Sequence, residues 1–190
     1  MSDNKKPYIK YSTDELMEVV DVFNVSAQAQ AAIRAVLERE QQAPDAGNFF
    51  RYYNPRSKTQ LFEEKVQEKV GVKHALAVNS GTSALISAVV AAGIGPGDEV
   101  IVPAYTFFAS ASAVVVGKAI PVIVEIDETL TLDPAAVEKA ITPRTRAIMP
   151  VHMLGLPSNM DALLAIARKH KLVVIEDTAQ AFGGTYHGRY

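Results

Sequence analysis

From His74 to the C-terminus, short apolar runs alternate with stretches of helical periodicity, and this alternation is the strongest constraint on the fold. Runs that are apolar throughout, rather than at every second position, indicate strands that are covered on both faces. A strand that is followed each time by a helix is typical of a parallel sheet. We therefore predict an α/β fold, with a mostly parallel sheet and helices on both faces. The predicted strands are 75–78, 99–102, 120–124, 147–151 and 172–175, and the predicted helices are 82–92, 107–116, 134–141 and 160–170.

The N-terminal part of the chain has a different character. Residues 1–24 are polar and mixed, and they predict an arm or extended lead-in. The alanine-rich stretch 25–42 predicts a helix, and 59–70 predicts a second one because its apolar residues recur at helical spacing. We accordingly expect two parts, an N-terminal arm and helix over 1–58 and a large domain over 59–190.

Composition narrows the class of protein. The hydrophobic share of 48% and the charged share of 21% are typical of a globular protein, and the formal net charge of −2 gives no reason to expect nucleic acid or a membrane as partner. The absence of cysteine excludes disulfides and thiolate metal sites, and the four histidines show no metal-ligand spacing, so no metal is expected. The polar N-terminus and the short apolar runs predict a cytoplasmic protein.

The first constellation that bears on function follows the predicted strand 75–78. A turn of small hydroxyl residues and a glycine, Ser80-Gly81-Thr82-Ser83, leads directly into a predicted helix. Such a turn aims free backbone N–H groups and the positive helix end at whatever lies above the sheet, and a phosphate is the natural occupant. The alternative is that Ser80 or Thr82 merely caps the helix.

The second constellation is Glu176-Asp177, which ends an apolar strand. Carboxylates are costly to bury there unless something pairs with them, although an exposed loop acid is the alternative. Asp177 is expected at the same edge of the sheet as the Gly81 turn. A carboxylate that faces a heteroaromatic nitrogen keeps it protonated, as in a pyridoxal site. Gln180 falls on the same side if a helical turn follows, and its amide could reach a ring hydroxyl.

Two further positions lie just beyond predicted strands. Phe107 is expected to stack on a flat ring, because the two constellations above imply one, while Phe108 is expected in the core. The alternative is that both phenylalanines are core residues. His152 is predicted to point into the same edge of the sheet, where it would contact cofactor or substrate; a loop histidine that is satisfied by its neighbours is an equal alternative.

Taken together, these residues resemble the DegT/DnrJ/StrS family of pyridoxal-phosphate (PLP) dependent sugar aminotransferases. The order and separation of the matching stretches fit as well, and the match covers about Phe62 to Tyr190. The matching stretches are Ala77-Val78-Asn79-Ser80-Gly81-Thr82-Ser83-Ala84-Leu85, Gly95-Pro96-Gly97-Asp98-Glu99-Val100-Ile101-Val102-Pro103, Thr106-Phe107-Phe108-Ala109-Ser110, Pro150-Val151-His152-Met153-Leu154-Gly155 and Glu176-Asp177-Thr178-Ala179-Gln180.

The resemblance implies an aspartate-aminotransferase-type (fold type I) large domain, acting as a homodimer. It implies transfer of an amino group from glutamate or glutamine to a keto sugar, often nucleotide-linked. The aromatic segment Phe49–Tyr53 would line the sugar site.

The resemblance also implies the cofactor contacts. Residues 81–83 would hold the phosphate, and Phe107 would stack on the pyridine ring. Asp177 would pair with the ring nitrogen as the catalytic carboxylate, and Gln180 would bond the ring oxygen.

One departure from the family pattern concerns the lysine that carries the cofactor. The family has it a few dozen residues beyond the aspartate, and no lysine follows Asp177 in this sequence. We expect the chain to be the N-terminal part of an aminotransferase, without its small domain. The alternative is a non-catalytic PLP- or sugar-binding regulatory protein of the same fold.

Overall fold

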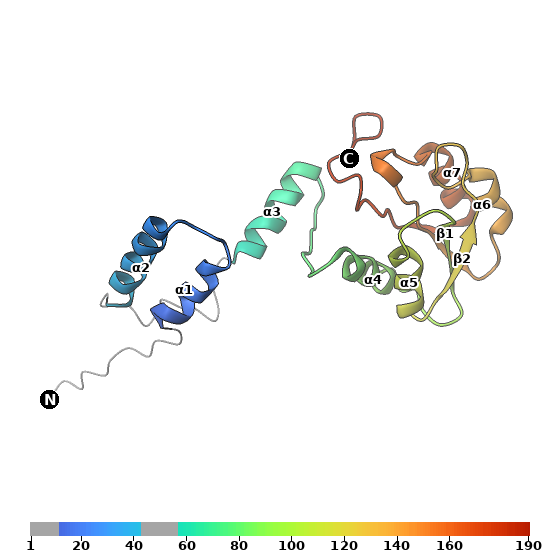
Figure 1. Cartoon of the computed structure of the whole chain (residues 1–190). Coiled ribbons are helices and arrows are strands. Elements are labelled where there is room, and N and C mark those ends of the chain that lie inside the picture. The colour runs from blue at the N-terminus through green and yellow to red at the C-terminus, as the bar shows by residue number, and fades with distance from the viewer. Residues whose placement is uncertain (1–11, 43–56) are drawn as a thin grey trace. The chain divides into compact units, whose positions relative to one another are not determined.

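The computed structural model describes residues 12–42 and 57–190, and the chain divides into two compact units after Lys58 (Figure 1). The aromatic segment Phe49–Tyr53, expected at the sugar site, lies outside the described residues. Within the described ranges, no helix combines the length and the apolar character that crossing a membrane would need.

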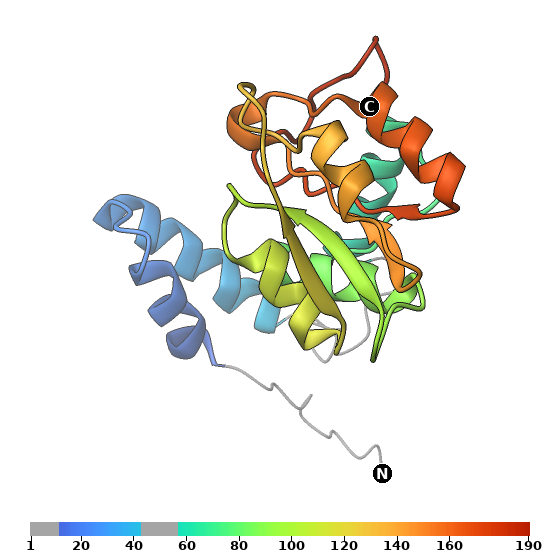
Figure 2. The ribbon, with the colours of Figure 1, turned by 90° about the vertical axis from the view of Figure 1, so that its right-hand side faces the viewer.

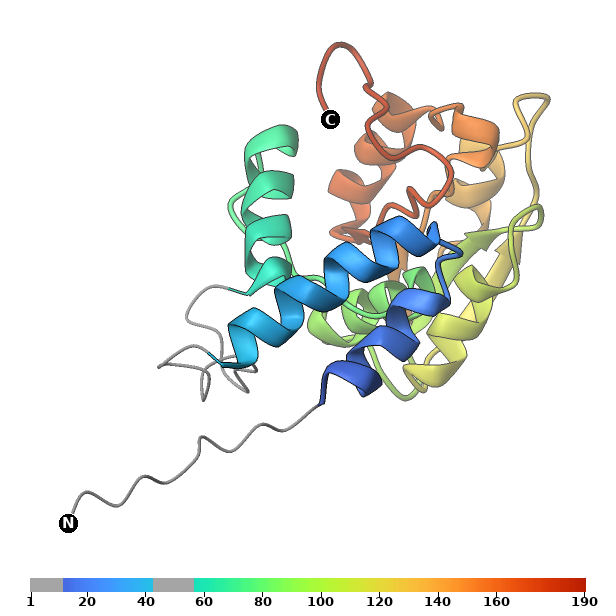
Figure 3. The ribbon, with the colours of Figure 1, turned by 60° about the vertical axis from the view of Figure 1, so that its left-hand side comes forward.

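The described residues of the first unit form two helices, α1 (Thr13–Asp21) and α2 (Ala27–Gln41). They run in opposite directions, since the Thr13 hydroxyl at the start of α1 donates to Gln41 Oε1 at the end of α2, at 3.0 Å (Figure 3). The expected extended arm over 1–24 is therefore wrong for the residues of α1. A capping box begins this helix: the Ser12 hydroxyl accepts from the backbone N–H of Glu15, whose carboxylate accepts from the backbone N–H of Ser12.

The second unit is built on a four-stranded sheet in the order β2-β1-β3-β4, in which every neighbouring pair is parallel. This confirms the predicted α/β class; Figure 2 shows the sheet with helices beside it. The strands are β1 (Glu99–Pro103), β2 (Ile120–Val124), β3 (Thr145–Ile148) and β4 (Val173–Val174).

The helices of this unit begin and end within a few residues of the predicted positions. They are α3 (Lys58–Val70), α4 (Gly81–Ala91), α5 (Ala109–Val116), α6 (Pro134–Ala140) and α7 (Met160–His170), with a short 3-10 turn, η2, at Met153–Gly155.

Strand β1 shows why the sheet is covered on both sides. Val100 and Val102 pack into a core with α4 and α5, while Ile101 packs into a second core with α6 and α7. All five residues of β1 are buried, because successive side chains point to opposite faces and each face carries helices. The continuous apolar run is thus the direct sequence signature of this arrangement.

The predicted strand 75–78 does not form. Leu76 is 78% exposed, and the backbone N–H of Ala77 donates to Glu63 Oε1 of α3, at 2.8 Å, rather than to a strand. A strand exists only through its partner's backbone, and among the described residues none lies beside this segment. The apolar composition alone was therefore insufficient.

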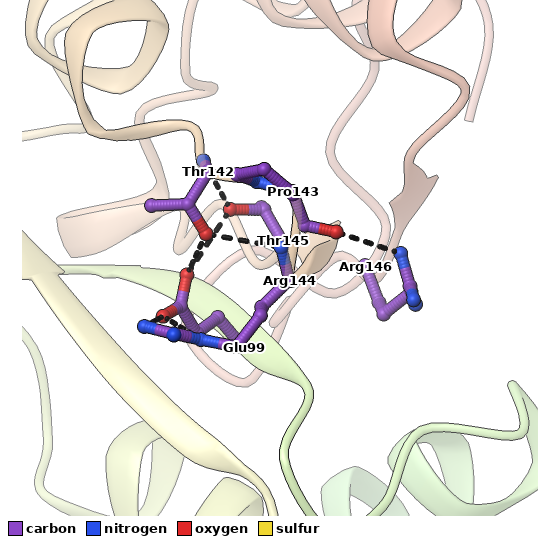
Figure 4. A network of polar contacts seen from close by, with 6 residues as sticks. All are labelled: Glu99, Thr142, Pro143, Arg144, Thr145 and Arg146. Carbon is purple, nitrogen blue, oxygen red and sulfur yellow. Dashed lines mark hydrogen bonds and ion pairs between the residues drawn. The ribbon is translucent and has the colours of Figure 1, made fainter.

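At the amino end of the sheet, the buried Glu99 carboxylate gathers a polar network (Figure 4). Its Oε2 accepts from the hydroxyls of Thr142, at 2.5 Å, and Thr145, at 3.4 Å, and its Oε1 accepts from the Arg144 guanidinium. Hydrogen bonds from Thr142 and then Arg144 lower the pKa of Glu99, against the opposing effect of burial. This network fastens β1 to the start of β3.

Candidate functional site

Backbone pairing continues beyond the regular parts of β3 and β4 and brings two predicted site residues together. Ile175 N–H donates to the Ile148 carbonyl at 3.0 Å, and Asp177 N–H donates to the Pro150 carbonyl at 2.9 Å. His152 N–H then donates to the Asp177 carbonyl at 3.2 Å. Asp177 and His152 therefore lie side by side at the carboxyl edge of the sheet, where open α/β sheets bind ligands.

The Asp177 carboxylate is buried, with the residue only 8% exposed, so it is not the exposed loop acid of the alternative interpretation. Its Oδ2 accepts from the Ser110 hydroxyl at 2.8 Å, and its Oδ1 accepts from the backbone N–H of Ala179 at 3.2 Å. Each oxygen thus has one donor from the protein and retains acceptor capacity for a ligand.

The N-terminus of α4 lies at the same edge. The Ser80 hydroxyl caps the helix by accepting from Ser83 N–H at 3.0 Å, so the capping interpretation of Ser80 is correct. Capping still leaves backbone donors available to a ligand, because the N–H groups of Gly81 and Thr82 have no acceptor within the helix. A side chain added at Gly81 would meet no atom within 4 Å, which leaves open space above these groups.

A cavity of about 240 Å³ joins these two features. It has the α4 N-terminus on one side and the segment after β4 on the other, so that the positive end of a helix and the acidic residues Glu176 and Asp177 border one space. The lining residues are Gly81, Ala84, Leu85, Glu176, Asp177, Thr178, Ala179 and Phe182. Of the predicted site residues, Gly81 and Asp177 line it directly. Phe182 is an addition that the sequence analysis missed, because it follows the motif on a turn without periodicity.

Phe107 and Phe108 are both exposed, at 61% and 70%, with ring centroids 4.6 Å apart. The expected core position of Phe108 is wrong. Helix α5 buries Ala109, Ser110, Ala113 and Val114, and Phe108 lies about opposite that face at the helical spacing. Exposure leaves the Phe107 ring free to contact a ligand, and it leaves Phe108 without a core role.

Gln180 lies in a series of turns rather than in the helical turn considered for it, since Ala181 N–H donates to Thr178 O at 2.9 Å. Its side-chain Oε1 accepts from Leu154 N–H at 2.7 Å. This bond fixes which end of the amide is turned inward to the protein and leaves the NH₂ group as the available donor.

His152 is buried and both of its ring nitrogens have partners. Nδ1 accepts from the backbone N–H of Ser158 at 3.1 Å, which requires the proton to sit on Nε2 in the neutral ring. Nε2 lies 3.0 Å from Oε2 of Glu176 and donates to it. The histidine is thus satisfied by its neighbours, and it also borders a second cavity.

This second cavity has a volume of about 310 Å³ and shares Glu176 and Thr178 with the first. Its remaining lining comes from Pro157, from α7 and from the last turns of the chain. Those residues are Pro157, Met160, Leu164, Ala181, Gly184, Thr185, Tyr186, Arg189 and Tyr190. Among the residues that the structure describes, no three histidine or acidic side chains are grouped so that they could hold a metal ion.

Ser110 is the main contact that sequence analysis missed. It is fully buried in α5, and its partner Asp177 lies 67 positions away. A small residue in a helix that covers a sheet indicates close packing, and no local signal distinguishes a serine that carries a hydrogen bond from one that fills space.

Comparisons with known proteins all point to one family of aminotransferases. The sequence model of the DegT/DnrJ/EryC1/StrS aminotransferase family matches residues 37–190. GDP-perosamine synthase of Caulobacter vibrioides is 55% identical over 129 residues, or 67% of this chain and 35% of that protein. The dTDP-3-amino-3,4,6-trideoxy-alpha-D-glucose transaminase of Streptomyces venezuelae is 54% identical over 67% of this chain and 34% of that protein. The Pleiotropic regulatory protein of Geobacillus stearothermophilus is 51% identical over 62% of this chain and 32% of that protein.

Solved structures agree. S. venezuelae DesV, in complex with a ketimine intermediate, matches with a TM-score of 0.70 and 45% identity, over 94% of this chain and 44% of that one. NtdA from Bacillus subtilis, with bound cofactor PMP, matches with a TM-score of 0.69 and 29% identity, over 99% of this chain and 40% of that one. The expected fold type I architecture is confirmed. The chain spans about a third of the length of the three relatives named in the preceding paragraph, from Caulobacter, Streptomyces and Geobacillus.

Proposed function

Because this chain belongs to the DegT/DnrJ/EryC1/StrS aminotransferase family, we propose that it forms the PLP-binding part of an aminotransferase that moves an amino group to a keto sugar. The main support for the proposal is the cavity that Gly81 and Asp177 both line. One end of it suits an anion and the other end suits a protonated ring nitrogen, and PLP has both groups.

The phosphate end consists of the first turn of α4. The N–H groups of Gly81 and Thr82 and the hydroxyls of Thr82 and Ser83 would bind the phosphate, helped by the positive end of the helix. Gly81 brings no side chain into this space, and that keeps the backbone accessible. The donors at this end therefore fit the phosphate of the cofactor.

The ring end consists of residues beyond β1 and β4. Asp177 would pair with the ring nitrogen, the exposed Phe107 would stack on the ring, and the NH₂ group of Gln180 would donate to the ring oxygen. When bound, PLP supplies a ring that stabilises negative charge at the carbon next to the amino group. The role of Asp177 is to present its carboxylate to the ring nitrogen, so that the nitrogen keeps its proton.

The substrate is proposed from the relatives. Two of them are named for nucleotide-linked amino sugars, which favours a nucleotide-linked keto sugar as acceptor. Glutamate or glutamine is proposed as the amino donor on family membership alone. The second cavity would take part of the keto sugar, bordered by His152, whose Nε2–H is directed by Glu176. We also propose that the protein acts as a homodimer, on the basis of family membership alone.

A direct test has two stages. In the first, PLP is titrated into the chain and followed by equilibrium dialysis, with Asp177→Asn as the variant. We expect binding that weakens by about tenfold or more in the variant, because the charged partner of the ring nitrogen is lost. In the second, the protein encoded by the whole gene is given glutamate or glutamine with a nucleotide-linked keto sugar. Mass spectrometry should show the amino sugar; wild-type protein that does not bind PLP would refute the proposal.

A second candidate is a regulatory protein of the same fold. The 51% identity to the Pleiotropic regulatory protein of Geobacillus stearothermophilus favours it. The same assay separates the candidates, since a regulator would bind PLP or the nucleotide sugar and yet give no aminated product with any donor.

A further inference from the structure

We propose that Ser110, oriented by Thr106, is a positioning residue that holds the Asp177 carboxylate toward the ring nitrogen of the bound cofactor. The proposal rests on the proposed function and adds two residues to it. It is carried by a row of three side chains that links the beginning of α5 to the segment after β4. The Thr106 and Ser110 hydroxyl oxygens lie 2.9 Å apart, and the Ser110 hydroxyl lies 2.8 Å from Oδ2 of Asp177.

The burial of Ser110 argues that its hydroxyl is present for a contact. The residue is 0% exposed, on the face of α5 that packs against the sheet, among residues such as Ala109 and Ala113. Burying a hydroxyl without a partner costs free energy that an alanine would not. Among the residues that the structure describes, its partner Asp177 is the one buried carboxylate at this edge of the sheet.

The direction of the hydrogen bonds follows from the count of protons. An ionised carboxylate only accepts, so the single Ser110 proton points to Oδ2 of Asp177. Thr106 must therefore donate to the Ser110 oxygen, which gives one direction along the chain, from Thr106 to Ser110 to Asp177. Donors arranged head to tail polarise each other and strengthen the last bond.

Two donors from different elements fix the carboxylate. Ser110 of α5 holds Oδ2, while the backbone N–H of Ala179, in the turn after β4, holds Oδ1. With both oxygens held, the carboxylate cannot rotate about its last bond without losing one of them. Asp177 is therefore already oriented before a ligand arrives, and binding need not include the cost of ordering it.

The test uses the whole 190-residue chain and compares PLP with its 1-deaza analogue, in which a C–H replaces the ring nitrogen. Wild-type protein should prefer PLP, because only PLP offers the protonated nitrogen to Asp177. Ser110→Ala should reduce that preference by about fivefold, because the variant loses a hydrogen bond to a charged carboxylate. Affinity for the analogue should stay nearly unchanged, and a merely structural role would instead weaken both ligands alike.

Matched variants guard against a general packing effect. Ser112→Ala removes a hydroxyl from the same helix that bonds only the Ala109 carbonyl, at 3.3 Å, and it should leave the preference unchanged. Thr106→Val should lower the preference about twofold, and Thr106→Ser, which keeps the hydroxyl, should restore it. Circular dichroism establishes that each variant is folded.

The outcomes separate the two proposals. A preference for PLP that Ser110→Ala and Thr106→Val both leave intact would overturn the positioning role and leave the proposed function standing. Wild-type protein that binds neither ligand would refute the proposed function, and the positioning role with it. Equal affinity of the wild-type protein for both ligands would show that Asp177 does not pair with the ring nitrogen. The positioning role of Ser110, which depends on that pairing, would then be refuted.

Discussion

The Arg144 guanidinium donates two hydrogen bonds to Oε1 of Glu99, from Nε at 2.9 Å and from Nη2 at 2.6 Å. Glu99 opens β1 and Arg144 directly precedes β3, so this contact joins the amino ends of two neighbouring strands. The candidate site lies at the carboxyl ends of the same sheet. Substitutions at Glu99 or Arg144 should therefore change stability without altering the candidate site.

Replacing Glu99 by glutamine should destabilise the fold by about 2 kcal/mol. The variant keeps the size of the side chain but turns an NH₂ group toward donors that now lack a charged acceptor. The midpoint of urea denaturation measures the effect. Arg146→Gln is the control: its ion pair with Asp98 is half exposed, so a loss below about 1 kcal/mol is expected. Equal losses in the two variants would contradict the importance of the buried network.

The same carboxylate should give stability a dependence on acid pH. Hydrogen bonds from Thr142 and Arg144 hold the pKa of Glu99 below its ordinary value of 4.5 in the folded state. Its contribution is therefore complete above pH 4.5 and is lost as the pH falls through the lowered pKa. We expect the stability difference between wild type and Glu99→Gln to shrink as the pH falls below 4.5. Urea midpoints across this range measure it, and a constant difference would argue against the assignment.

Gly81→Val should separate folding from binding. The Gly81 backbone has no left-handed φ, and an added Cβ meets nothing within 4 Å. The free energy of unfolding, measured by urea denaturation, should therefore change by less than about 1 kcal/mol. The valine would occupy the space above the helix end, and PLP affinity should drop by about tenfold or more. Gly95→Val, in a turn with similar space, is the control and should bind normally. Undiminished binding by Gly81→Val would place the phosphate elsewhere.

The two exposed phenylalanines form a matched pair. Both Phe107→Ala and Phe108→Ala should leave stability nearly unchanged, because neither ring is buried. Only Phe107→Ala should weaken PLP binding, by roughly tenfold, the value of a good aromatic stack. Dialysis titrations of both variants provide the measurement. A larger loss in Phe108→Ala would reverse the assignment of the stacking residue.

His152 tests the role of a single backbone contact. His152→Ala should cost about 2 kcal/mol, because it leaves the buried N–H of Ser158 without the Nδ1 acceptor. His152→Asn should cost clearly less, since its amide oxygen can take the place of Nδ1. Urea denaturation of the two variants compares them. If asparagine recovers nothing, the bond to Ser158 contributes little to stability.

Local patterns in the sequence determined the architecture. The apolar runs around Val100 and Ile148 predicted buried parallel strands, because a strand with helices on both faces cannot alternate apolar and polar residues. The start of α1 was also predictable from the sequence, because Ser12 and Glu15 have the spacing of a capping box. The polar composition of the segment led instead to the prediction of an extended arm. Family membership followed from motifs of this local kind.

Tertiary structure alone decided the contacts that shape the candidate site. Segment 75–78 has the composition of a strand but lacks a neighbouring strand among the described residues. Phe108 is apolar but lies opposite the buried face of α5, and Ser110 is an ordinary small residue until the fold places it against Asp177. The reason is physical: composition and periodicity act along the chain, whereas a hydrogen bond between residues 67 positions apart exists only once two elements have packed together.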